Sequence, residues 1–353
     1  MSFKRLGDYI ERIQAADEKT PKPSDRPFNN GTAKSPPLLR PRGVNRILLF
    51  PGSFNPPHQG HLSLLKHIFE NAGDDLHIIA AIILITDDER LRLKLDHNPE
   101  NKNAILLPRG QRAHLWRGDG IPVDWAWVYD NSEASWADFR TELIGELRKD
   151  QIELKFTLLS GPDAITADGG YNQEYWDCPD AITSDISRPV DFRYPNTLRQ
   201  IAGCSPWERL SYDHGRLERQ IRARFRHKQE SGKSSSKTHQ DTSTNSQSPV
   251  VEDALTKAFD KLSTVSICRS LRKPRGTIRF LPCDLDRRPD DAPSSTKIRA
   301  IIANSSGDEL EKKLQGIALH PPLLVKYVKA QSDHGRQPSD SEKQVEYQRA
   351  DKA

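Results

Sequence analysis

Residues 47–62 read Ile-Leu-Leu-Phe-Pro-Gly-Ser-Phe-Asn-Pro-Pro-His-Gln-Gly-His-Leu, and this stretch decides the fold. The four apolar residues at 47–50 suit a strand that is buried on both faces. Pro51-Gly52 predicts a tight turn, and Asn55-Pro56-Pro57 predicts the entry to a helix. The stretch therefore predicts a parallel strand that runs through a sharp turn into a helix.

Two histidines, His58 and His61, lie at the predicted start of this helix, about one turn apart on one face. The first turn of a helix offers unpaired backbone N–H groups and the positive end of a dipole, which together bind anions. A plain surface loop is the alternative interpretation of two histidines beside a proline-rich turn. With the preceding strand included, the pattern favours a phosphate site.

The string from residue 52 to residue 61 resembles the strand-turn-helix signature of the nucleotidylyltransferase superfamily. In that superfamily an (H/T)xGH element grips the phosphates of a nucleoside triphosphate. The resemblance implies catalytic roles for His58 and His61. It also implies nucleotide contacts for Gly52, Ser53, Phe54 and Gly60.

A second motif, Ser294-Ser-Thr-Lys-Ile-Arg299, follows a strand-like run at 277–281 and opens an amphipathic helix. Its hydroxyls are natural N-cap residues, so the pattern alone is also that of an ordinary helix start. The motif is similar to the SSTxIR element of the same superfamily, whose Arg neutralises the triphosphate. The resemblance implies a catalytic role for Arg299 and nucleotide contacts for Ser294, Ser295 and Thr296.

A third element, Ser160-Gly161-Pro162-Asp163, ends an apolar strand, where ligands of parallel sheets bind. Taken alone, Gly-Pro-Asp is an ordinary turn. The element resembles the GxD element of nicotinamide and nicotinate mononucleotide adenylyltransferases, which implies that Gly161 and Asp163 hold the adenosine ribose. Residues 181–189 resemble the strand and Arg-Pro that follow in those enzymes, which makes Arg188 a candidate contact of the acceptor.

Three further acceptor-binding candidates come from the middle of the chain. Lys94 and Arg112 look like the basic positions that follow the second strand of the adenylyltransferases, although charged residues of this kind also form ordinary solvated faces. Trp136 lies where the family places aromatic side chains that stack on the pyridine ring. Trp125 and Trp127 alternate with smaller apolar residues, so we expect them to pack in the core instead.

Two departures from the adenylyltransferase pattern leave the acceptor open. The eukaryotic members have Thr where this chain has His58, and the HxGH form is shared with bacterial and cytidylyl-transferring branches. The ribose element also continues as Asp163-Ala-Ile instead of aspartate-leucine. A transferase that uses CTP or another acceptor is therefore an alternative. So is a regulatory or scaffold protein that retains the nucleotide site.

The resemblance implies that the partners are ATP and a mononucleotide, with Mg²⁺ bound mainly through the ATP phosphates. We expect no dedicated metal-binding cluster, because the motif histidines are expected to contact phosphate and not a metal ion. Class I aminoacyl-tRNA synthetases also have an HxGH motif. The chain has no KMSKS-like loop, which argues against membership of that class.

Apolar runs at 76–85, 125–129, 152–159 and 277–281 alternate with helical stretches, of which 134–147 is the clearest. This alternation predicts an α/β fold with a doubly wound parallel sheet of the Rossmann-like nucleotidylyltransferase type. We expect a flexible N-terminal arm with a short amphipathic helix at 6–13, and a polar, disordered tail on the other side of one domain. That domain contains an insertion that is part helical, at 198–221, and part disordered. The expected boundaries are 1–43 for the arm, 44–330 for the domain, 191–275 for the insertion and 331–353 for the tail.

The composition limits partners and compartment. A net charge of +4 is too small to indicate specific nucleic-acid binding, and 35% hydrophobic residues is low enough to predict disordered segments. Four widely spaced cysteines predict free thiols, and the absence of a long apolar run predicts a cytoplasmic protein without a membrane contact. The basic stretch 216–228 is either a solvated helix or a nuclear import signal. The arm and the insertion are candidates for binding protein partners, and no pattern indicates the oligomeric state.

Overall fold

The computed structural model describes residues 4–16, 26–97, 105–118, 120–169, 173–232, 249–284 and 292–334. The chain divides into two compact units. Unit 1 consists of Met1–Gly52, Gly60–Leu84 and Pro122–Ala292, and unit 2 consists of Ser53–Gln59, Ile85–Ile121 and Pro293–Ala353. The chain thus leaves unit 1 at the proline-rich turn and returns to it one residue into the next helix.

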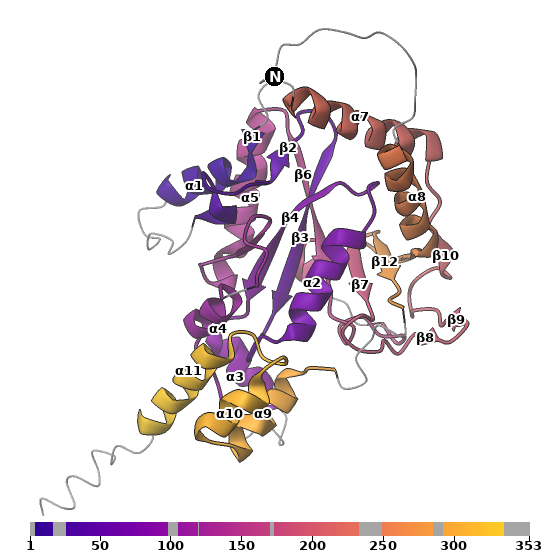
Figure 1. The fold of residues 1–353 in the computed structure, drawn as a ribbon. Coiled ribbons are helices and arrows are strands. Elements are labelled where there is room, and N and C mark those ends of the chain that lie inside the picture. The colour runs from indigo at the N-terminus through magenta and orange to yellow at the C-terminus, as the bar shows by residue number, and fades with distance from the viewer. Residues whose placement is uncertain are drawn as a thin grey trace, which may run out of the picture. The chain divides into compact units, whose positions relative to one another are not determined.

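Unit 1 is built on an eight-stranded sheet with the order β10-β11-β12-β7-β6-β3-β4-β5 (Figure 1). The pairings β12–β7, β7–β6, β6–β3 and β4–β5 are parallel, whereas β10–β11 and β11–β12 are antiparallel. The strands are β3 (Val44–Gly52), β4 (Ile78–Ile85), β5 (Ala126–Val128), β6 (Glu153–Leu159), β7 (Ala181–Ser184), β10 (Glu208–Arg209), β11 (Ser266–Arg269) and β12 (Thr277–Leu281). The α/β fold class predicted from the alternating pattern is confirmed, with a sheet that is mixed at one edge.

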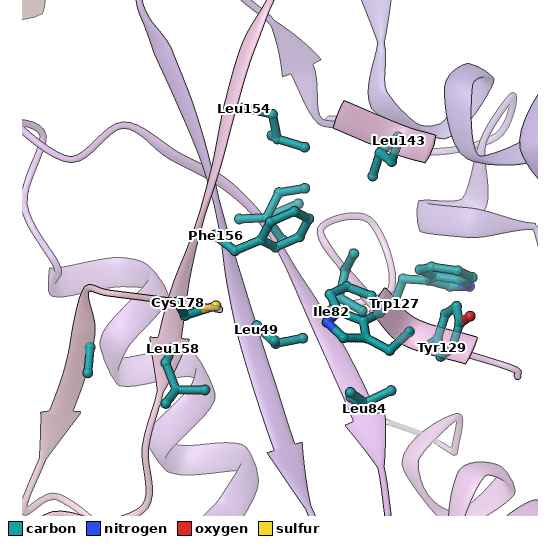
Figure 2. Packing of buried hydrophobic residues seen from close by; sticks show 14 of the residues in the cluster. Leu49, Ile82, Leu84, Trp127, Tyr129, Leu143, Leu154, Phe156, Leu158 and Cys178 are labelled. Carbon is teal, nitrogen blue, oxygen red and sulfur yellow. The ribbon is translucent and has the colours of Figure 1, made fainter. Parts of the chain in front are cut away.

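The central strands are apolar on both faces, as parallel strands covered by helices require. Every second residue of β4, including Ile82 and Leu84, enters the same core as Leu49 of β3 and Phe156 of β6 (Figure 2). Trp127 of β5 belongs to this core and is 4% exposed, as the sequence predicts. This packing fixes the strands whose carboxyl ends carry the motifs.

Helices and short strands complete unit 1. The clearest predicted helix is observed as α5, where Phe139, Leu143 and Leu147 are buried at helical spacing. The remaining elements are β1 (Lys4–Arg5), α1 (Leu6–Ala16), η1 (Pro27–Asn29), β2 (Leu38–Leu39), α2 (Gln59–Asn71), η3 (Glu133–Ser135), α5 (Trp136–Lys149), α6 (Gln173–Trp176), β8 (Arg193–Tyr194), β9 (Thr197–Leu198), α7 (His214–Gly232) and α8 (Pro249–Thr264).

The N-terminal segment differs from the flexible arm expected at 1–43. Helix α1 buries Leu6, Tyr9, Ile10 and Ile13 in the main core of unit 1 and contacts α5. Lys4 of β1 also forms an ion pair with Asp150, with 2.6 Å between Nζ and Oδ1. The segment was expected to be flexible because polar residues surround its amphipathic stretch, but the apolar stripe of α1 is wide enough to dock the helix.

The segment expected as an insertion at 191–275 contributes directly to the sheet, because β10 and β11 extend its antiparallel edge. The helix predicted at 198–221 begins only at His214, and Leu198 lies in β9 instead. Helices α7 and α8 share a separate apolar cluster that includes Leu217, Ile221 and Leu255. Disorder was expected at 227–249, and residues 233–248 of that stretch lie outside the described residues, as does most of the predicted tail.

Unit 2 is helical in its described part. Ile298, Leu310, Leu314 and Leu324 form its core with Leu115. Its helices are α3 (Asp88–Asp96), α4 (Arg109–Trp116), α9 (Ser295–Asn304), α10 (Gly307–Leu314) and α11 (Pro321–His334). The predicted amphipathic helix after the second motif is thus observed as α9.

All four cysteines are free, as the sequence predicts, and all four are buried. Burial raises the pKa of Cys178 to about 12. None of the described helices combines the length and apolar character needed to span a bilayer.

Candidate active site

The turn between β3 and α2 is held in unit 2 by the side chain of Asn55. Its Oδ1 accepts a hydrogen bond from the N–H of Leu107 at 3.0 Å, and its Nδ2 donates to the carbonyl of Ile105 at 2.8 Å. Asn55 is 2% exposed, so both bonds are sheltered from water. Phe54 beside it has a positive φ of 45° and packs edge-on against Trp116, with ring centroids 5.1 Å apart. The turn therefore has one well-defined conformation.

A short segment after α10 pairs with the same turn inside unit 2. The N–H of Gln59 donates to the carbonyl of Ile317 at 2.9 Å, and the N–H of Leu319 donates to the carbonyl of Pro57 at 3.3 Å. Between them, His58 and Ala318 form an antiparallel bridge. The backbone around His58 is thus tied to a segment about 260 residues further along the chain.

The first residues of α9 also form hydrogen bonds with the turn. The hydroxyl of Ser295 donates to the carbonyl of Pro56 at 2.8 Å, and Nη1 of Arg299 donates to the carbonyl of Asn55 at 2.9 Å. Unit 2 therefore brings together the two motifs that the sequence analysis selected from opposite ends of the chain. Two hydrogen bonds thus join the second motif, which supplies the donors, to the first motif, which supplies the acceptors. These bonds restrict the position of each motif relative to the other.

The remaining hydroxyls of the second motif have local partners. Ser294 is the N-cap of α9, and its side chain accepts from the N–H of Lys297 at 3.1 Å. Nη2 of Arg299 donates to the hydroxyl of Thr296 at 3.1 Å. The guanidinium is half-buried, and this burial lowers the pKa of Arg299. Arg299 is consequently held in place before any ligand arrives.

The two motif histidines belong to different units. His58 precedes α2, lies in unit 2 and is 3% exposed, whereas His61 lies in the first turn of α2 in unit 1 and is half-buried. The His61 ring lies edge-on to Phe50 of β3, with centroids 6.4 Å apart. His61 is therefore the more accessible of the two imidazoles. Gly52 ends β3, and Gly60 lies within α2.

The ribose element lies in unit 1 at the carboxyl end of β6. Oδ1 of Asp163 is 3.4 Å from Nη2 of Arg188, and both side chains reach solvent. A Cβ atom on Gly161 would lie 2.8 Å from the same carboxylate oxygen. Only glycine at this position leaves the carboxylate where it is. The structure thus brings together Gly161, Asp163 and Arg188, three residues that the sequence analysis singled out.

The placement of Arg112 corrects its prediction as an acceptor contact. Its side chain has no exposed surface, and its guanidinium donates to protein acceptors through Nε, Nη1 and Nη2. Burial lowers the pKa of Arg112. The arginine is a structural part of unit 2 and is not available to a substrate in this structure.

Trp136 is likewise not placed to stack on a ligand. It is 4% exposed and packs edge-on against Tyr129 and Phe156, with centroids 5.4 and 5.5 Å away. The reason is its position on the apolar stripe of α5, which turns the indole into the core. Lys94 lies on α3 with an exposed side chain, and its contact with an acceptor stays a prediction.

Sequence reasoning missed the residues that hold the motifs in place. Asn55 was quoted only as a turn residue, and Asp88 and the segment 317–319 were not considered. An asparagine inside a proline-rich turn is a usable signal, because its side chain often bonds nearby backbone. No comparable signal marks 317–319, whose contribution is made by backbone atoms.

The donors around the turn suit phosphate better than a bare metal ion. The motif residues are hydroxyls, imidazoles, backbone groups and a guanidinium, whereas Mg²⁺ prefers carboxylate and carbonyl oxygens. Across the described ranges, no three His, Cys, Asp or Glu side chains gather as a metal-binding group. A magnesium ion carried by the phosphates of a nucleotide would fit this set, because it needs few protein ligands.

Comparisons with known proteins agree with the motifs. Residues 49–103 match the family model described as cytidylyltransferase-like. The chain is 29% identical over 119 residues to a probable nicotinate-nucleotide adenylyltransferase of Chlorobium phaeobacteroides. That match covers 33% of this chain and 55% of the relative, so it spans about half of the bacterial protein. These matches confirm the predicted resemblance to the nucleotidylyltransferase superfamily.

Two similar solved structures are complexes of the nicotinic acid mononucleotide adenylyltransferase of Plasmodium falciparum. The complex with APC has a TM-score of 0.35 and 10% identity over 81% of this chain and 96% of the other. The complex with NaAD has a TM-score of 0.35 and 11% identity over 81% and 95%. Similarity at this level supports no conclusion about ligands.

Proposed function

We propose that this protein is an ATP-dependent adenylyltransferase that joins AMP to nicotinamide or nicotinate mononucleotide and releases pyrophosphate. The observation that carries the proposal is the contact between the two motifs, in which Ser295 and Arg299 bind the carbonyls of Pro56 and Asn55. Motifs that matched by chance would have no reason to meet in the folded chain. Their contact supports a shared role in holding one triphosphate.

The chemistry needs positioning and charge neutralisation more than acid–base catalysis. The acceptor phosphate is anionic at neutral pH and attacks the α-phosphorus of ATP in line, which expels pyrophosphate. We assign to His58 and His61 hydrogen bonds to phosphate oxygens and to Arg299 a bidentate contact with the leaving pyrophosphate. The first turn of α2 adds backbone N–H groups and the positive end of its dipole. Mg²⁺, when bound through the phosphates, would neutralise part of their charge.

In the same proposal, Asp163 accepts hydrogen bonds from the ribose hydroxyls of ATP. In this structure Oδ1 of Asp163 lies 3.4 Å from Nη2 of Arg188. The ribose would therefore compete with Arg188, whose guanidinium would then be released to bind an anion such as the acceptor phosphate. This gives Arg188 a defined role to test, while Lys94 remains the other basic candidate for the acceptor.

A cytidylyl-transferring enzyme is the second candidate, because the matching family model is cytidylyltransferase-like and the motif has the HxGH form. Thermal stabilisation by magnesium complexes of ATP and CTP would separate the two. The proposal predicts a clear rise in melting temperature with ATP and a smaller one with CTP. A preference for CTP would replace the first candidate with the second. Stabilisation by neither nucleotide would contradict both candidates. The regulatory or scaffold role, which keeps the nucleotide site, predicts stabilisation by a nucleotide without turnover, and in that role protein partners of the N-terminal segment and of residues 191–275 matter more.

A further inference from the structure

The guanidinium of Arg112 is buried in unit 2 and forms four hydrogen bonds. Nε donates to the carbonyl of Leu107 at 2.8 Å, and Nη1 donates to the carbonyl of Ser53 at 2.6 Å. Nη2 donates to the carbonyl of Thr86 at 2.8 Å and to Oδ1 of Asp88 at 2.6 Å. The residue thus joins three separate chain segments, one of which is the turn between β3 and α2.

Three of these acceptors are uncharged carbonyls, so the arrangement is more than an ion pair. A planar guanidinium with donors in a fixed fork can serve all four acceptors, whereas a lysine ammonium is a point charge with three donors. Asp88 in turn accepts from the N–H of Arg109 at 2.7 Å, which ties it to the start of α4. The geometry therefore selects arginine at position 112.

Asn55 makes a parallel connection only two residues along the turn, because its amide bonds residues 105 and 107. The carbonyl of Ser53 and the side chain of Asn55 are thereby attached to the same short stretch, 105–112. Between these anchor points lies Phe54, with its positive φ. A backbone held in this rarely populated region needs support from its surroundings.

We propose that Arg112 is a positioning residue of the phosphate site, which acts by holding the Ser53 carbonyl and thus the turn that leads to His58. The effect on catalysis rests on the function proposed above, whereas the effect on the turn does not. Loss of the guanidinium leaves the buried carbonyls of Thr86 and Leu107 and the part-buried carbonyl of Ser53 without this donor. Each such group favours a conformation in which it reaches water.

Hydrogen exchange of the full-length protein tests the inference directly. In Arg112→Lys, amides of the peptide spanning residues 50–62 should exchange at least about tenfold faster, while those of β6 keep their protection. The side chain of Asp88 is 41% exposed, so Asp88→Asn weakens the hydrogen bonding of Arg112 with less risk to folding. This variant should accelerate exchange in the same peptide by a smaller factor. Arg92→Lys on the exposed face of α3 is the matched control and should change neither peptide.

Activity provides a second readout if the wild type is an enzyme. Arg112→Lys should lower kcat roughly ten- to hundredfold, with a smaller change in the KM for ATP, because a displaced turn misaligns bound phosphates. Equal acceleration of exchange in the turn and in β6 would show a role in global stability only and overturn the inference, and so would unchanged exchange in the turn. A wild type without transferase activity would contradict the proposed function but leave the exchange result decisive.

Discussion

Nη1 of Arg299 donates a hydrogen bond to the carbonyl of Asn55 at 2.9 Å, although the two residues lie 244 positions apart in the chain. This hydrogen bond between distant parts of the chain restricts both the guanidinium of Arg299 and the backbone at Asn55. In a phosphate site this matters, because a guanidinium already held in place loses little freedom when a ligand binds. The contact gives Arg299 a structural role beside the phosphate contact proposed for it.

Arg299→Lys should therefore impair the site while the fold survives. Lysine keeps the charge but cannot donate to Asn55, Thr296 and a phosphate in the same planar geometry. We expect kcat/KM for ATP to fall about a hundredfold and the melting temperature to change little, since the side chain is only half-buried. Steady-state kinetics and thermal unfolding measure the two effects. Lys326→Ala on the exposed face of α11 is the control, and wild-type kinetics for Arg299→Lys would contradict the assignment.

Ser294 and Ser295 are adjacent hydroxyls with different partners, so their alanine variants should behave differently. Ser294→Ala removes an N-cap and should cost about 1 kcal/mol of stability with little effect on catalysis. Ser295→Ala removes the bond to Pro56 and should cost about 1 kcal/mol as well as lowering kcat. Chemical denaturation and kinetics on both variants check this. Equal kinetic effects from the two would show that the Pro56 contact has no special role.

Gly161→Ala should weaken nucleotide binding by moving the carboxylate of Asp163. The new methyl group would lie 2.8 Å from Oδ1, and the exposed carboxylate can turn away at little cost to stability. We expect a higher Kd for ATP with an unchanged melting temperature, measured by calorimetry and thermal unfolding. Gly145→Ala in α5 is the matched control: nothing lies within 4 Å of its added Cβ, and it should stabilise by about 1 kcal/mol. An unchanged Kd for Gly161→Ala would remove Asp163 from the ribose site.

We predict that the folded protein loses stability in mild acid because of His67. Burial is the main cause that lowers the pKa of His67 below its ordinary value of 6.5. Since the unfolded chain binds a proton more readily, the stabilising contribution is complete above about pH 6.5 and is lost as the pH falls towards the folded pKa. His67→Leu should flatten this part of the curve of unfolding free energy against pH. An equally steep curve in the variant would show that other groups cause the acid sensitivity.

The sequence predicted the central fold because its signals are local. Runs such as 47–50 and 152–159 are long enough and apolar enough to define buried parallel strands, and the motif that follows 47–50 defines a helix start, observed as α2. The antiparallel edge escaped prediction because β10 is only two residues long and its partners lie far away in the chain. Helix α1 was recognised as amphipathic, but whether it docks depends on α5, which no local pattern reveals.

For the candidate site, too, local motifs could be predicted from the sequence and long-range contacts could not. The motif residues were predicted from resemblance, whereas the contacts between the motifs join residues that no spacing rule connects. Arg112 and Trp136 were misjudged because polarity and aromatic character do not show which way a side chain points. In the folded chain, α4 directs Arg112 towards four protein acceptors, and the stripe of α5 directs Trp136 into the core.

The most direct test of the central claim is release of pyrophosphate from ATP and Mg²⁺, with nicotinamide mononucleotide, nicotinate mononucleotide or no acceptor, in the wild type and in His61→Ala. We expect release that depends on one or both acceptors and a kcat at least about a hundredfold lower in the variant, whose melting temperature should stay close to that of the wild type. Binding of ATP without acceptor-dependent release, or equal release by wild type and variant, would contradict the adenylyltransferase assignment.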